Sequence, residues 1–325
     1  MRIGYRAVGL LTVLVTLALT ITPATQSAQQ PQSQLSPTHI QPVLINVTVT
    51  NKDGEFVTGL EPDDFEISID KKTASIASLS NADAPASVGI LIDSSGSMRG
   101  RSASSTGKHF AVVREALRKF LEASNQSNDY FLVSFNRRSQ LLANWTSDHP
   151  TILEKVNELP GPGTALYDAC YMGVGKLLGG QHTKRAMVII SDGMDNESKY
   201  TFNQVRELLK ETNVLLYSIY FPANPEMGSS LGLEGQGILE ELSSVSGGRL
   251  FFGKDGVPLK PKDLNLAFQI IATELRRQYA ISIVPNESSH GKKWRKVKVK
   301  VVRDPATPRL LKGLTVRTRE GFFSH

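Results

Sequence analysis

Two short apolar runs constrain the fold of this chain more than any other feature. Residues 88–92 and 186–190 contain no polar side chain, and each run ends close to an aspartate. Strands that are apolar throughout are typical of a parallel sheet covered on both faces. A helical period follows the first run, with apolar side chains at Phe110, Val113 and Leu117. Strands then alternate with helices as far as about residue 277, which predicts a doubly wound, mostly parallel α/β sheet over residues 85–277.

The expected elements of this α/β region follow from periodicity and from turn residues. A glycine-rich stretch at 228–237 has no Lys and follows no buried strand, so we expect a flexible loop there. The expected strands are 130–135, 139–142, 214–220 and 249–252, and the expected helices are 150–158, 165–178, 202–211, 238–245 and 264–277.

Segments with a period of two flank the α/β region on both sides. Residues 39–84 contain an alternating run at 43–50 and further short strand patterns, including one at 56–57. Residues 278–325 contain three more strand patterns. Because the ends of an inserted domain usually lie close together, we expect both flanks to form one small β-sandwich. The alternative is a separate β unit at each end.

The first residues have the order of a secretory signal peptide. Arg2 and Arg6 precede an uncharged apolar stretch, and small residues such as Ala24 and Ala28 follow it. We therefore expect a signal peptide at residues 1–28, and a secreted, periplasmic or cell-surface protein. An uncleaved anchor is the alternative, although the apolar stretch is short for a span of about 20 residues. Residues 29–38 are rich in Gln, Ser and Pro, which predicts a disordered spacer.

The formal charge of +6 does not by itself indicate a nucleic-acid partner. Much of the excess lies at residues 292–300, where lysines alternate with valines. This alternation indicates a half-buried strand with a solvated face, on which lysine also discourages pairing at a sheet edge. We expect no nucleic-acid partner and no membrane span after removal of the signal peptide. The single cysteine, Cys170, cannot form an internal disulfide and is expected to be a buried thiol.

Oxygen-bearing side chains follow the buried strands of the predicted sheet. Asp93, Ser95 and Ser97 occupy alternate positions directly after the run at 88–92, and Asp192 follows the run at 186–190. Thr164 precedes a predicted helix. Ligands of open α/β sheets bind at the carboxyl ends of the strands. Since hydroxyl and carboxylate oxygens suit Mg²⁺, Ca²⁺ or Mn²⁺, the five side chains are expected to converge on one divalent ion.

The sequence here resembles the von Willebrand factor A domain family. Residues 93–97 match its Asp-x-Ser-x-Ser motif, and Thr164 and Asp192 match the distal Thr and Asp of its metal-ion-dependent adhesion site. The resemblance covers about residues 85–275. It implies direct metal ligation by Ser95, Ser97 and Thr164, with Asp93 and Asp192 acting through water or hydrogen bonds. Weaker similarity of the flanks extends to a secreted bacterial group of such proteins.

Each of these residues also has a purely structural interpretation. Asp93 could cap the segment that follows it, Thr164 could be a helix N-cap, and Asp192 could belong to an ordinary turn. Asp168, one helical turn after Thr164, is expected to support the site, and pairing with a neighbouring helix is its alternative. Residues 195–197 are interpreted as a solvated loop. The metal site is favoured because oxygen-bearing side chains coincide with four strand and helix ends.

These observations favour a secreted interaction module over an enzyme. With few protein carboxylates around it, a divalent ion would accept an Asp or Glu of a partner protein. The six histidines have no metal-ligand spacing, His109 is interpreted as a helix-start residue, and no nucleophile elbow or phosphate-binding loop is present. Two alternatives stay open: a metal-assisted hydrolase, and a scaffold with a purely structural ion.

Overall fold

The computed structural model describes residues 42–98, 103–156, 161–222, 230–254, 259–285, 292–302 and 313–324. The predicted signal peptide (1–28) and spacer (29–38) lie outside these residues. Among the described helices, none combines the length and the apolar character needed to cross a bilayer.

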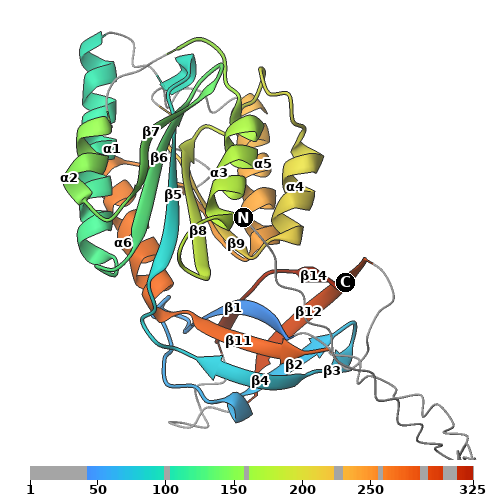
Figure 1. Ribbon diagram of the computed structural model, residues 1–325. Coiled ribbons are helices and arrows are strands. Elements are labelled where there is room, and N and C mark those ends of the chain that lie inside the picture. The colour runs from blue at the N-terminus through green and yellow to red at the C-terminus, as the bar shows by residue number, and fades with distance from the viewer. Residues whose placement is uncertain are drawn as a thin grey trace, which may run out of the picture. The chain divides into compact units, whose positions relative to one another are not determined.

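A six-stranded sheet forms the centre of the α/β region (Figure 1). Its order is β10-β9-β8-β5-β6-β7, and all strands are parallel except β7, which runs antiparallel to β6 at one edge. The strands are β5 (Ala86–Asp93), β6 (Asp129–Phe135), β7 (Ser139–Thr146), β8 (Lys184–Ser191), β9 (Val214–Tyr220) and β10 (Arg249–Phe251).

Helices cover both faces of this sheet, which confirms the predicted doubly wound α/β fold (Figure 1). On one face lie α1 (Ala103–Ala123), α2 (His149–Lys155) and α6 (Pro261–Arg277), and on the other lie α3 (Leu166–Leu178), α4 (Phe202–Glu211) and α5 (Ser230–Ser246).

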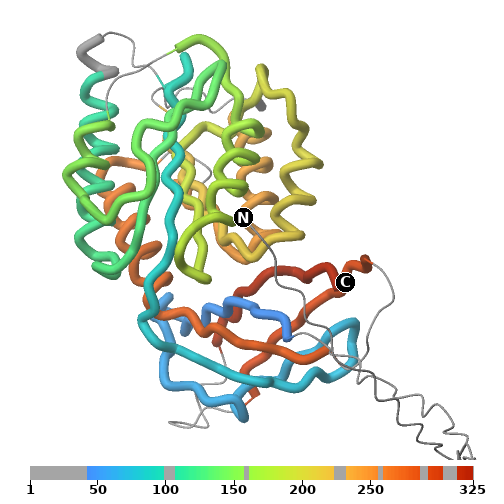
Figure 2. Tube along the Cα trace, viewed as in Figure 1, coloured from blue at the N-terminus to red at the C-terminus, as the bar shows by residue number. Residues whose placement is uncertain are grey.

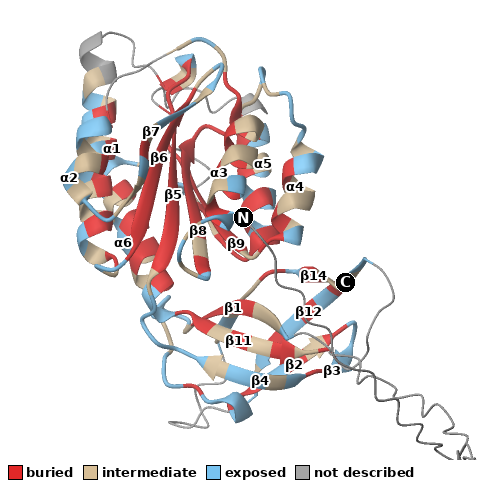
Figure 3. Cartoon of the chain, viewed as in Figure 1, coloured by how far each residue is buried: buried red, intermediate tan, exposed pale blue. Residues whose placement is uncertain are grey.

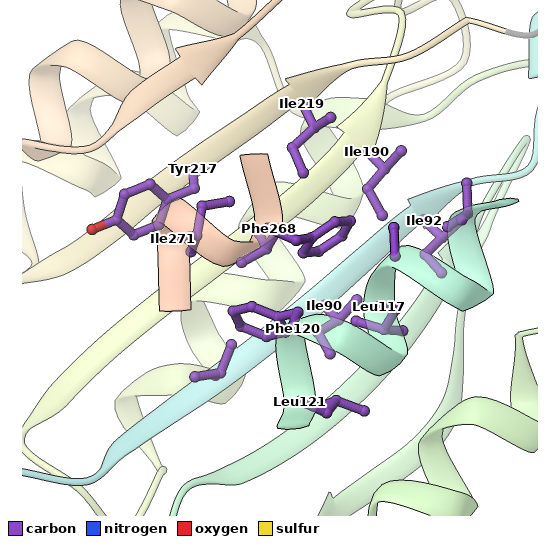
Figure 4. Close-up of a cluster of buried hydrophobic side chains, with 14 of the residues drawn as sticks. Ile90, Ile92, Leu117, Phe120, Leu121, Ile190, Tyr217, Ile219, Phe268 and Ile271 are labelled. Carbon is purple, nitrogen blue, oxygen red and sulfur yellow. The ribbon is translucent and has the colours of Figure 1, made fainter. Parts of the chain in front are cut away.

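The apolar run of β5 is explained by these two layers. Ile90 and Ile92 join the core beneath α1 and α6, and Leu91 joins the core on the opposite face. Figure 4 shows the first of these cores, where the rings of Phe120 from α1 and Phe268 from α6 lie 5.4 Å apart between centroids. A strand that is covered on both faces favours apolar side chains along its length, and polar side chains are expected at its ends.

The predicted flexible loop at 228–237 is wrong from Ser230 onward, because α5 begins there and not at residue 238. One glycine of this segment, Gly235, serves close packing. A Cβ at Gly235 would lie 2.1 Å from the carbonyl oxygen of Asp192, so only glycine lets the helix approach the residues after β8. Helix propensity is low at such positions, and the tertiary contact outweighs it.

Strands from both flanks share two antiparallel sheets, which confirms the predicted sandwich. In Figure 2 the blue and red ends of the described chain run through the same β region. One apolar core, which includes Ile45, Ile67, Ile281 and Phe322, lies between the sheets. The orders are β13-β1-β11-β4 and β14-β12-β2-β3, with β1 (Val43–Thr50), β2 (Phe65–Ile69), β3 (Lys72–Thr73), β4 (Ser75–Ser80), β11 (Tyr279–Val284), β12 (Lys293–Val301), β13 (Thr315–Arg317) and β14 (Gly321–Ser324).

Three details of the flanks and of Cys170 complete the comparison with the sequence. In the expected strand at 56–57, Phe56 forms only an isolated bridge with Thr50, and β14 was not predicted. The lysine-rich segment is a strand with buried valines, but it lies between β14 and β2 and is not an edge. Cys170 is fully buried, and burial raises the pKa of its thiol.

A buried carboxylate joins the sandwich to the α/β region. Glu274 of α6 has no exposed surface and accepts hydrogen bonds from Tyr217 of β9 at 2.8 Å and from Thr48 of β1 at 3.3 Å. Arg317 of β13 forms an ion pair with the same carboxylate, and Arg249 of β10 lies 3.5 Å from it. Residues that are distant in the sequence therefore depend on one buried charge.

We expect Glu274→Ala to lower the free energy of unfolding by about 3–5 kcal/mol, because two arginines would lose their buried partner. Glu66→Ala is the matched control. It removes an exposed pair with Lys300 at 2.9 Å, and such pairs contribute at most about 1 kcal/mol. Denaturant unfolding measures both variants, and equal losses would contradict the role given to Glu274.

Candidate metal site

The site begins at the carboxyl end of β5, where Asp93 is completely buried. One carboxylate oxygen accepts the backbone N–H of Ser95 at 2.8 Å, and the other accepts the hydroxyl of Ser191 at 2.6 Å. The first bond holds the turn after β5, and the second joins β5 to the end of β8. Asp93 therefore does cap the following residues, as the structural interpretation proposed, but it also has a partner on the neighbouring strand.

The two serines of the motif lie in the turn that follows. Ser97 belongs to the short 3₁₀ turn η2 (Gly96–Met98), and its hydroxyl lies 3.0 Å from that of Ser95. Ser95 is buried, and Ser97 is partly exposed. Two hydroxyl oxygens at this separation can act as adjacent ligands of one small cation.

Asp192 directly follows β8 and is 3% exposed. Its Oδ1 accepts the backbone N–H of Met194 at 3.1 Å. Its Oδ2 is buried and has no hydrogen-bond partner among the described residues. An unpaired buried carboxylate oxygen is costly, so this atom fits a bound cation. The turn proposed as an alternative is present, but it accounts for only one of the two oxygens.

Thr164 is placed by the loop after β8. Its backbone N–H donates to Asn196 at 2.8 Å, and its carbonyl accepts the N–H of Asn196 at 2.9 Å. Thr164 is 5% exposed, and the N-cap of α3 is the next residue, Ala165. The interpretation of Thr164 as a helix N-cap is therefore wrong.

Hydrogen bonds connect the turn after β5, the end of β6 and the segment that precedes α3. The N–H of Gly161 donates to the carbonyl of Ser94 at 2.9 Å. The N–H of Ala165 donates to the carbonyl of Asn136 at 2.7 Å. The hydroxyl of Ser94 accepts that of Ser134 at 2.9 Å. The ends of β5 and β6 and the start of α3 are thus held as one unit. Ser94, Ser191 and Asn196 were not expected from the sequence to hold the site. Residues 195–197 were interpreted as a solvated loop.

Asp168 bonds to the backbone of the segment that precedes α4. Its Oδ1 accepts the backbone N–H groups of Lys199 at 2.8 Å and Tyr200 at 3.0 Å. It fixes the start of α4 and does not support the site in the way that was expected. His109 is likewise not at a helix start, since α1 begins at Ala103, and its ring stacks on Phe221 at 4.7 Å.

The position of these loops agrees with the topology of the sheet. The chain leaves β5 toward β6 on one side and leaves β8 toward β9 on the other, so the order reverses between β5 and β8. Ligands of open α/β sheets bind at such a reversal. Asp93 and Asp192 stand at the carboxyl ends of the two strands beside it.

Comparison with known families identifies the segment that contains these loops. Residues 88–194 match the family described as von Willebrand factor type A domain. This segment is a von Willebrand factor A domain. The match includes all five candidate residues and begins and ends within the α/β region.

Solved structures with a similar fold come from several bacteria. The protein BatB of Bacteroides thetaiotaomicron is 14% identical, with a TM-score of 0.44 over 59% of this chain and 98% of that one. The vWF domain of the type V pili tip protein Mfa5 of Porphyromonas gingivalis is 14% identical, with a TM-score of 0.47 over 59% and 95%. A von Willebrand factor type A protein of Catenulispora acidiphila is 12% identical, with a TM-score of 0.45 over 88% and 74%. No curated protein matches the sequence.

In the von Willebrand factor A domain, burial and repulsion by a neighbouring carboxylate disfavour the ionised form of Asp93. Burial, and then the neighbouring Asp192 carboxylate, raise the pKa of Asp93 from 3.8 to about 7, against the hydrogen bonds from Ser191 and Ser95. A cation between the two carboxylates would remove this repulsion. The residues present therefore fit a divalent ion.

This pKa shift predicts that the stability of the metal-free protein depends on pH. A folded acid with a raised pKa holds its proton when the unfolded acid has lost it, so Asp93 makes stability fall as pH rises from about 4 to about 7. Burial lowers the pKa of His109 to about 4, which gives the opposite slope. The thermal midpoint in chelator, compared with that of Asp93→Asn across this range, isolates Asp93. Parallel curves for the two proteins would show that Asp93 does not titrate there.

The close approach of α5 to the site gives a second prediction. Gly193 has φ +79°, and a Cβ there would lie 2.1 Å from the carbonyl oxygen of Gly235. Gly54 has φ +80° with open space around it. We expect Gly54→Ala to cost about 1–2 kcal/mol from backbone strain alone, and Gly193→Ala to cost more and to weaken metal binding. Unfolding and calorimetric titration measure the two effects, and equal behaviour of both variants would refute the packing argument.

Proposed function

We propose that this protein is a secreted interaction module whose von Willebrand factor A domain binds a divalent cation and, through it, a carboxylate of a partner protein. The observation that carries the proposal is the buried Oδ2 of Asp192. It has no partner among the described residues and lies in the same site as a second buried carboxylate.

The donor set favours a hard cation. In the described part of the chain, no group of three or more His, Cys, Asp or Glu side chains could hold a metal ion. The candidate site instead combines two aspartates with hydroxyls. Ser95, Ser97 and Thr164 would hold the ion directly, and Asp93 and Asp192 would hold it through water. Mg²⁺ suits this set, because it retains several waters in protein sites, and Ca²⁺ or Mn²⁺ could take its place.

The same donor set supports binding of an anionic partner. Hydroxyl ligands are neutral, so much of the charge of the ion would remain uncompensated at the protein surface. Ser97 is partly exposed, which supports an opening of the proposed site on its side of the turn. An Asp or Glu of a partner protein would supply both the missing charge and an oxygen ligand.

Hydrolysis is the alternative that a metal site invites. A metal-assisted hydrolase needs a general base within hydrogen-bond reach of the attacking water. His109, which follows the motif at residues 93–97, packs against Phe221, and none of the five candidate residues bonds to a histidine in the described structure. We therefore favour binding. Turnover of an ester, phosphate or peptide substrate that Asp93→Ala abolishes would favour hydrolysis instead.

Two threonines allow a matched test of the metal site. Thr164→Ala removes a proposed ligand, and we expect it to weaken Mg²⁺ binding by about tenfold or more, the equivalent of one hydrogen bond to a charged group. Thr201→Ala removes the N-cap of α4, which lies outside the site, and should cost about 1 kcal/mol of stability without changing Mg²⁺ affinity. Isothermal titration with Mg²⁺ gives both affinities.

Partner binding is then tested on the same variants. Proteins captured from cell-surface fractions should be lost with chelator and with Thr164→Ala, and retained with Thr201→Ala. If Mg²⁺ binds but capture is independent of it, the ion is structural and the interaction proposal is wrong. If Mg²⁺ does not bind to the unaltered protein, the metal site itself is wrong.

A further inference from the structure

The sandwich has one long edge strand with no strand on its outer side in the described chain. β4 (Ser75–Ser80) pairs with β11 alone, and it is the longest of the four edge strands of the two sheets. Figure 3 shows it as mostly exposed. Ser75, Ala77, Ser78 and Ser80 are exposed even though the short turn η1 (Pro62–Asp64) comes close to this strand.

This edge lacks most of the usual protection against pairing. Exposed edges are commonly blocked by lysine, by proline, by inward-pointing charges, by β-bulges or by being very short. Of these features, β4 has only an irregularity in its pairing with β11. The segment 74–82 contains neither a charged residue nor a proline. The other edges are shorter, and two of them are charged: β3 has two residues and includes Lys72, β13 has three and includes Arg317, and β14 has four uncharged residues.

An irregularity in β4 turns both of its large apolar side chains to the same face. Ile76 is opposite Ile283 and Leu79 is opposite Ile281, with a register shift between them. Ile281 and Ile283 are fully buried, and directly opposed residues of an antiparallel pair share a face. Without the shift, residues 76 and 79 would point to opposite faces. Both apolar side chains therefore line the core side of the sheet at its open edge, where each is only partly buried.

The order of side chains in β4 is self-complementary. The strand reads Ser-Ile-Ala-Ser-Leu-Ser. When two copies are set antiparallel about a two-fold axis, Ser75 faces Ser80, Ile76 faces Leu79, and Ala77 faces Ser78 of the second copy. Serine faces serine, isoleucine faces leucine, and alanine faces a serine of similar size, and the two Ile–Leu pairs fall on the core side. No like charges meet anywhere along the edge.

We propose that β4 is an interface at which this protein pairs with a second copy of itself, joining the two β13-β1-β11-β4 sheets into one continuous antiparallel sheet. A two-fold interface of this kind uses the same residues on both subunits, so it closes at the dimer and does not extend to a fibre. The proposal is independent of the metal site, which lies in the α/β domain.

Six residues make a small interface. Stable complexes bury well over 1,000 Å² in total, and the edge strand alone covers less. The dimer is therefore a weak one that forms at high local concentration, as on a surface to which many copies are attached. In solution it should appear as a concentration-dependent rise in mass.

Sedimentation velocity of the purified protein over a range of concentrations tests the proposal. The unaltered protein should shift toward the dimer as its concentration rises. Ser78→Lys, which brings two lysines together near the two-fold axis, should abolish the shift. Gln140→Lys is the matched control, since it adds a lysine at an exposed position of the other long edge strand, β7. A protein that is monomeric at every concentration overturns the proposal. So does a dimer that Gln140→Lys disrupts and Ser78→Lys does not.

Thiol cross-linking tests the register. Ser75→Cys and Ser80→Cys, made as separate variants and then mixed, should form a disulfide between the two copies under mild oxidation. Either variant alone should not, because equivalent positions lie about five residues apart along the strands, roughly 17 Å, beyond the reach of a disulfide. The natural cysteine, Cys170, is buried and does not compete. Equal cross-linking of the single variants would contradict the proposed pairing.

Discussion

Two aspartates lie at the ends of neighbouring strands in a sheet that helices cover on both faces. The loops around them hold both carboxylates in place. Asp93 has no exposed surface and Asp192 is 3% exposed. Buried carboxylates are stable only when hydrogen bonds or a cation compensate their charge. Asp93 receives two hydrogen bonds, whereas one oxygen of Asp192 receives none in the described chain. This imbalance is the reason for assigning a cation to the site.

The strands that position this site could be predicted from the sequence because their burial is uniform. The runs at 88–92 and 186–190 have no polar side chain until the edge of the sheet, so the aspartates mark the strand ends directly. Asp93, Ser95, Ser97 and Asp192 were predicted because they follow these runs, and Thr164 because it precedes a predicted helix and matches the distal Thr of the resembled family. Asn196 and Ser191 were not, since an Asn in a polar loop and a Ser at a strand end have many possible partners. Only the fold shows that they hold Thr164 and Asp93.

Other errors arose where tertiary contacts outweigh local propensity. Glycines near residue 235 suggested a flexible loop, but Gly235 allows α5 to contact the backbone of Asp192. Glu274 lies three residues after Ile271, on the buried face of α6, where a charged side chain is not expected. Its carboxylate is buried there because Tyr217, Thr48 and Arg317 bond to it. Periodicity does not identify these partners, since they come from three distant strands.

The most direct test of the metal assignment is anomalous diffraction from crystals of the protein grown with Mn²⁺, measured near the manganese absorption edge. A single strong anomalous peak bounded by the hydroxyls of Ser95, Ser97 and Thr164, with Asp93 and Asp192 around it, is the expected result. A peak elsewhere on the molecule, or no peak in crystals saturated with Mn²⁺, would contradict the account.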